Sequence, residues 1–88
     1  MRLDKFLKIS RIIKRRSVAN EVTSAGRVKL NERVAKPSTE VSVGDIIEIG
    51  FGSGTTRLRV LDIKEHVRKE EAAELYEILE SDPKIAEN

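Results

Sequence analysis

The first sixteen residues of this chain combine a high density of cations with an apolar repeat. They hold seven basic side chains and one acid, Asp4. Lysine and arginine bind phosphates by displacing counterions, and arginine can also hold a phosphate through two parallel hydrogen bonds. These residues therefore favour the binding of a polyanion. The basic residues are Arg2, Lys5, Lys8, Arg11, Lys14, Arg15 and Arg16.

The charge is divided unevenly along the chain. Residues 1–36 contain eleven basic and three acidic residues, which gives a net charge of +8. Residues 37–88 contain six basic and twelve acidic residues, which gives a net charge of −6. Such asymmetry suggests that one end meets a polyanion. The alternative is that the two halves neutralise each other within the fold. The clustering of the cations on particular elements favours nucleic-acid binding.

Residues that could support catalysis or metal binding are sparse. Cysteine is absent and His66 is the single histidine, so neither a disulfide nor a thiolate or histidine metal site is expected. No serine lies in a recognisable nucleophile motif. The glycine-rich segment 50–56 lacks the Gly-Lys-Ser/Thr ending of a phosphate-cradling loop. We expect a non-catalytic protein with no metal and no cofactor.

Two short helices should position most of the cations. Apolar residues at helical spacing predict a first helix from Leu3 or Asp4 to about Ser10. A basic connection then leads to a second helix. Ser17 is its expected N-cap, and Gly26 is expected just after its end, where a left-handed residue is common.

After these helices the apolar period changes to two, which predicts strands. Val28 and Leu30 should face one way, and Asn31-Glu32 should form a tight turn. Further strands are expected at residues 46–49 and 57–63, with a flexible loop over residues 50–56 between them. Ala72, Leu75, Tyr76 and Leu79 form a stripe that predicts a helix from Arg68 to Glu80.

The predicted fold class is α+β. Two N-terminal helices should pack on a small, bent antiparallel sheet of four or five strands, followed by a C-terminal helix. We expect one RNA-binding domain over residues 1–80, with a core motif at 2–49, a strand and helix extension at 50–80 and a flexible tail at 81–88. No apolar run reaches the length of about 18 residues that a membrane span needs, and we expect a cytoplasmic monomer.

Residues 2–49 carry an ordered set that resembles the RNA-binding domain named after ribosomal small-subunit protein four, the S-four or αL domain. Two positions depart from the family pattern. Thr23 stands where a large aliphatic residue is usual, and Glu32 stands where a turn glycine is common. The set consists of Arg2-Leu3-Asp4-Lys5, Arg16-Ser17, Ala19, Gly26-Arg27-Val28, Asn31, Lys36-Pro37-Ser38 and Gly44-Asp45.

Four features resemble the free-standing group of ribosome-associated quality control protein P (RqcP) and heat-shock protein fifteen: the length, Lys14-x-Arg16, Lys36-Pro37-Ser38 and the short acidic C-terminal helix. The resemblance implies binding to large ribosomal subunits that carry an obstructed peptidyl-tRNA. The protein would contact large-subunit rRNA and the tRNA and hold the tRNA in the P site while a partner factor adds a C-terminal alanine tail.

The resemblance also implies a set of site residues. Arg2 and Arg16 would contact RNA phosphates, and Asp4 would orient one of these arginines or mediate a contact to RNA. With only three aromatic residues in the chain, recognition should be of RNA shape and backbone rather than by base stacking. Further cations would extend the patch, namely Lys8, Arg11, Lys14, Arg15, Arg27 and Lys29.

Two alternatives remain open at the level of the sequence. One is the recycling of free large subunits, as in the heat-shock relative. The other is a protein–protein adaptor whose acidic C-terminal helix is the working surface and whose basic face only tethers it.

Overall fold

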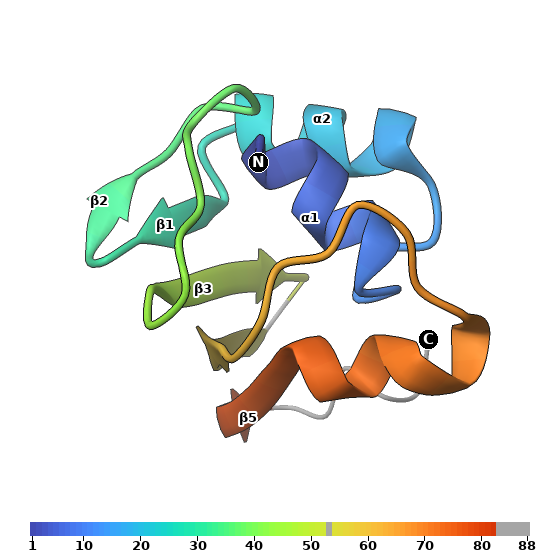
Figure 1. Ribbon diagram of the computed structural model, residues 1–88. Coiled ribbons are helices and arrows are strands. Elements are labelled where there is room, and N and C mark those ends of the chain that lie inside the picture. Colours follow the sequence, from blue (N-terminus) through green and yellow to red (C-terminus); the bar gives the residue numbers. More distant parts are fainter. Residues whose placement is uncertain (53, 83–88) are drawn as a thin grey trace.

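The computed structural model describes residues 1–52 and 54–82. Within them, two α-helices lie side by side over a five-stranded antiparallel sheet with the strand order β2-β1-β3-β4-β5 (Figure 1). This architecture confirms the predicted α+β class. The elements are α1 (Leu3–Ile9), α2 (Arg16–Ser24), β1 (Val28–Leu30), β2 (Arg33–Val34), β3 (Ile46–Phe51), β4 (Gly54–Val60), the 3₁₀-helix η1 (Lys69–Leu75) and β5 (Tyr76–Asp82).

The start of α1 is fixed by the loop that joins β2 to β3. The backbone N–H of Leu3 donates to the carbonyl of Thr39 at 2.8 Å, and that of Asp4 donates to the carbonyl of Pro37 at 3.1 Å. These bonds satisfy N–H groups in the first turn, which has no side-chain cap. Leu3, Phe6 and Leu7 of α1 are fully buried in the core, as the sequence predicted, and Ile9 is partly buried against it.

The second helix ends as predicted but begins two residues earlier, at Arg16. Gly26 adopts a φ of +81°, and its N–H bonds the carbonyl of Thr23 while the next N–H reaches back to Val22. This pair of hydrogen bonds is a Schellman motif. The prediction of Ser17 as N-cap was wrong, because the extended residue before the helix is Arg15, with φ −116° and ψ 132°.

The hairpin between β1 and β2 confirms the predicted turn. Leu30 pairs with Arg33, so the loop holds two residues, and both have positive φ: 50° at Asn31 and 70° at Glu32. Two positive values identify a type I′ turn, which matches the twist of the flanking strands. The Asn31 side chain also accepts from the N–H of Ile46 at 2.9 Å and so ties the turn to β3.

The C-terminal part departs from the sequence prediction. The expected helix from Arg68 to Glu80 is a 3₁₀-helix that ends at Leu75, and the chain continues at Tyr76 as β5, hydrogen-bonded to β4. The free backbone edge of β4 supplies bonding partners that a longer helix would leave unpaired. Of the apolar stripe, Ala72 and Leu75 are buried, at 3% and 1% exposure, whereas Leu79 in β5 is 38% exposed.

Two neighbouring predictions change with it. The flexible loop expected over residues 50–56 is mostly strand, because β3 continues to Phe51 and β4 begins at Gly54. The tail expected over residues 81–88 begins inside β5, and its residues 83–88 lie outside the described residues. No helix in the described part of the chain is both long and apolar enough to cross a membrane.

The sheet has a buried and an exposed face. The core face carries fully buried side chains from three strands, Val28 of β1, Ile47 of β3 and Leu58 of β4. The residues that alternate with them along each strand point outward. On the outer face, Arg59 pairs with Glu77 at 2.8 Å, and Arg57 pairs with Glu80. The helices therefore cover one face only, and charged pairs span β4 and β5 on the other.

Candidate nucleic-acid interface

Asp4 is the buried centre of a polar cluster between α1 and α2. Its side chain is 3% exposed, and it accepts hydrogen bonds from three residues. Arg2 donates from Nε to Oδ1 and from Nη2 to Oδ2, both at 3.2 Å. Arg16 donates from Nη2 to Oδ1, and Asn20 donates from Nδ2 to Oδ2, both at 3.3 Å. One carboxylate thus joins two arginines that lie fourteen positions apart in the chain.

The electrostatics of the cluster keep Asp4 ionised. Burial raises the pKa of the Asp4 carboxyl, but hydrogen bonds from Arg2 and Asn20, with the charge and hydrogen bond of Arg16, outweigh burial and hold the pKa below its usual value. A protonated Asp4 would lose acceptor capacity for the arginines. The charged form is therefore the one that fits this cluster.

The two guanidinium groups are fixed on one side and open on the other. The side chains of Arg2 and Arg16 are 50% and 47% exposed. Within residues 1–52 and 54–82, Arg2 Nη1 has no protein partner, and neither do Arg16 Nε and Nη1. The unused N–H groups can donate to a phosphate oxygen while Asp4 holds the other edge of each guanidinium group.

A second basic hollow lies at the far end of α1. It has a volume of about 150 Å³ and is bordered by the segment 65–67, which passes over α1 (Figure 1). Arg11 enters it from a left-handed backbone conformation with φ +62°. Lys5 pairs with Glu65 nearby and lowers the pKa of that carboxyl. The lining residues are Lys8, Ile9, Arg11, Lys14, Glu65, His66 and Val67.

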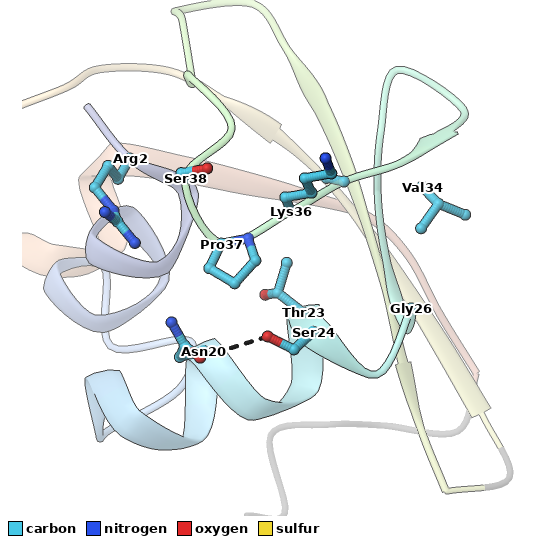
Figure 2. Close-up of a pocket in the computed structure, with 10 residues that line it drawn as sticks. Arg2, Asn20, Thr23, Ser24, Gly26, Val34, Lys36, Pro37 and Ser38 are labelled. Carbon is cyan, nitrogen blue, oxygen red and sulfur yellow. Dashed lines mark hydrogen bonds between the residues drawn. The ribbon is translucent and has the colours of Figure 1, made fainter.

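A groove runs from Arg2 along α2. It has a volume of about 510 Å³, and its two walls are the C-terminal half of α2 and the loop after β2 (Figure 2). Its lining residues are small and polar or apolar, with Arg2 and Lys36 as its two cations. They are Arg2, Asn20, Thr23, Ser24, Gly26, Val34, Ala35, Lys36, Pro37 and Ser38.

The structure brings some of the predicted site residues together and separates others. Arg2, Asp4 and Arg16 form one cluster, and Lys8, Arg11 and Lys14 line the second hollow. Arg15 and Arg27 are exposed just outside the two ends of α2. Lys29 lies on the outer face of the sheet, because its neighbour Val28 points into the core.

Sequence reasoning missed Asn20 and Lys36 as site residues. Asn20 follows Arg16 by four positions, a spacing that places both side chains on one face of a helix. That spacing was a usable signal. Lys36 comes to the site through the pairing of its loop with the start of α1, which no local pattern encodes.

An exposed, basic surface with fixed guanidinium groups defines this chain as an anion-binding protein of the kind that meets phosphate backbones. The family model for the S4 domain, which is the S-four domain, matches residues 1–47, and the chain belongs to this family.

Similar proteins cover nearly the whole chain. The RQC P-site tRNA stabilizing factor of Streptococcus pneumoniae is 51% identical over 88 residues, which are 100% of this chain and 99% of that protein. The factor of the same name from Halalkalibacterium halodurans is 51% identical over 83 residues, or 94% of each chain. Among solved structures, the trimeric structure of Vibrio cholerae heat shock protein 15 has a TM-score of 0.82 and 34% identity and covers 89% of this chain and 80% of that one.

Proposed function

We propose that this protein binds RNA through α1, α2 and the loop after β2, and that it acts in ribosome-associated quality control. On obstructed large ribosomal subunits it contacts large-subunit rRNA and peptidyl-tRNA and stabilises the tRNA in the P site. The observation that carries this proposal is the pair of half-exposed arginines held by the buried Asp4. The 51% identity to proteins named RQC P-site tRNA stabilizing factor supports the specific role.

The arginine pair suits a phosphate backbone for a physical reason. Ordering a flexible side chain at an interface costs about 0.5–1.5 kcal/mol. Asp4 fixes both guanidinium groups before RNA arrives, so less of this cost falls on binding. Contacts of this kind set position and affinity rather than base sequence.

The rest of the proposed role is non-catalytic. The protein acts as a cytoplasmic monomer that keeps the tRNA in place while a partner factor on the same subunit extends the nascent chain with alanine. The small site, made of two guanidinium groups and one amide around one carboxylate, supports a holding function.

Co-sedimentation with purified large subunits tests the proposal, with and without bound peptidyl-tRNA and at two salt concentrations. Arg16→Ala should weaken binding and reduce the slope of log affinity against log salt by about one, as the loss of one phosphate contact predicts. Arg59→Ala is the matched control. Both side chains are 47% exposed and paired with an acid, but Arg59 lies on the outer face of the sheet. Equal losses in the two variants would contradict the proposed site.

A second candidate is a factor for recycling free large subunits. The likeness to heat shock protein 15 favours it. Binding that strengthens when peptidyl-tRNA is present supports quality control, whereas binding indifferent to tRNA supports recycling. Absence of ribosome binding would refute both and leave the adaptor hypothesis.

A further inference from the structure

The groove beside the arginine pair offers more than phosphate binding requires. We infer that it receives one unstacked nucleotide of the bound RNA, with the base in the groove and the flanking phosphates on Arg2 and Lys36. This inference rests on the proposed function and names the RNA feature that the protein selects. RNA-binding proteins commonly read bases that are splayed out of a helix.

The lining of the groove suits a base. Thr23 and Ala35 line it and are buried, at 1% and 6% exposure, and the Thr23 hydroxyl is already paired within α2, donating to the Ala19 carbonyl at 2.7 Å. The rim carries an amide and two hydroxyls, from Asn20, Ser24 and Ser38. The Ser24 hydroxyl donates to Asn20 Oδ1 at 3.4 Å and Asn20 Nδ2 donates to Asp4, but both side chains keep acceptor or donor capacity for the polar edge of a base or a ribose 2′-hydroxyl. Figure 2 shows Asn20, Thr23 and Ser24 on the α2 wall, facing the loop residues.

The charge of the groove is complementary to a nucleotide. No acidic side chain is among the described residues that line it. Arg2 stands at the end that adjoins the Asp4 cluster, and its Nη1 is unused. Lys36 belongs to the opposite wall, and in the described part of the chain its amine has no ion pair. The volume of about 510 Å³ lies within the range of about 300–1,000 Å³ that is usual for small-ligand sites.

The loop wall of the groove is held in place by hydrogen bonds within the protein. The turn at its loop wall is closed by two bonds between Lys36 and Thr39, from the Lys36 N–H to Thr39 Oγ1 at 2.8 Å and from the Thr39 N–H to the Lys36 carbonyl at 3.0 Å. The bond from the Asp4 N–H to the Pro37 carbonyl fastens this wall to α1. A wall held in this way lowers the ordering cost of capturing a base.

Two RNA hairpins with the same number of phosphates test the inference on the full chain. One has a fully paired stem that contains 2-aminopurine, and the other carries the 2-aminopurine as a single bulged nucleotide. Affinity is measured by titration at one salt concentration, and the fluorescence of 2-aminopurine reports where the base goes. We expect about tenfold tighter binding of the bulged hairpin, which equals about 1.4 kcal/mol, and a fluorescence change on binding.

Ser38→Leu places a larger apolar side chain in the groove without changing charge. It should reduce the preference for the bulge, which is the ratio of the affinities for the two hairpins, to about onefold. Ser42→Leu is the matched control, because Ser42 is an exposed serine of the same loop outside the groove, and it should keep the full preference. Lys36→Gln provides a second variant and should also reduce the preference. Thermal melts verify that each variant is folded.

The outcomes separate this inference from the proposed function. Equal affinity of the unaltered protein for the two hairpins, or a preference that survives Ser38→Leu, would overturn the groove inference and leave RNA binding intact. Failure to bind either hairpin at low salt would overturn both. A bulge preference lost in Ser38→Leu and kept in Ser42→Leu supports the groove as the nucleotide site.

Discussion

Replacing Asp4 by Asn separates the effect of charge from the effect of position. The change removes one negative charge from the basic surface, so Coulombic attraction alone predicts tighter RNA binding. The structure predicts the opposite. An amide cannot accept at both of its ends, so Asp4→Asn breaks part of the set of bonds that fixes Arg2 and Arg16.

The magnitude follows from the two side chains that are released. Immobilising each arginine costs about 0.5–1.5 kcal/mol, so RNA would meet an added cost of roughly 1–3 kcal/mol, which corresponds to about 5- to 150-fold in affinity. The effect on folding should be smaller. Both arginines are half exposed and can return to water, and we expect a loss of about 1–2 kcal/mol in unfolding free energy.

Titration of a fluorescent RNA hairpin at several salt concentrations measures the effect of Asp4→Asn on affinity. Glu21→Gln is the matched control, because it removes the same charge from an exposed acid of α2 that has no ion pair within the described residues. It should leave binding unchanged or strengthen it slightly. Thermal unfolding of both variants verifies that the domain remains folded at the assay temperature.

One result would refute this reasoning. If Asp4→Asn binds RNA as tightly as Glu21→Gln does, or more tightly than the unaltered protein, Asp4 does not act by positioning arginines. The carboxylate would then serve the fold alone, through the packing of α1 against α2.

Three further outcomes are expected. The pKa of Asp4 is lowered in the folded state, so its contribution to stability is present above the usual aspartate value of about 3.9 and is lost as pH falls through the folded pKa. Denaturant unfolding from pH 7 to pH 3 should therefore show a smaller loss of unfolding free energy in Asp4→Asn than in the unaltered protein. Glu32→Gly should raise the unfolding free energy by about 0.5–1 kcal/mol, because glycine tolerates the φ of 70°, and a lower melting temperature would contradict this. Leu75→Ala should cost about 2–5 kcal/mol through loss of buried volume where η1 meets β5, and hydrogen exchange should show early opening of β5; a change below about 1 kcal/mol would contradict the packing described.

The parts of the fold that the sequence predicted depend on short-range signals. The ending of α2 follows from Gly26, and the β1–β2 hairpin follows from Asn31-Glu32, because both features are set by residues within one turn. The C-terminal part was mistaken for a long helix because Leu75, Tyr76 and Leu79 fit a helical stripe. The deciding factor was the open edge of β4, which a local pattern does not contain.

The site was predictable to a similar extent. The sequence grouped Arg2, Asp4 and Arg16 through the family resemblance, and the structure places them in one hydrogen-bonded cluster. The groove wall at Lys36 and Ser38 was not predicted to belong to the site. These residues meet α2 only because their loop folds back onto the start of α1, more than thirty positions away.

That fold-back has a consequence for how the protein folds. The first turn of α1 completes its backbone bonding only with carbonyls of Pro37 and Thr39, so this end of the helix closes by a contact of long sequence separation. Such contacts require loop closure and form slowly compared with a lone helix. A growing chain can form α1 and α2 early, but Arg2 and Asp4 reach their final geometry only after the hairpin and the following loop have been made. Binding competence should therefore appear together with the complete sheet rather than with the helices that carry the charge.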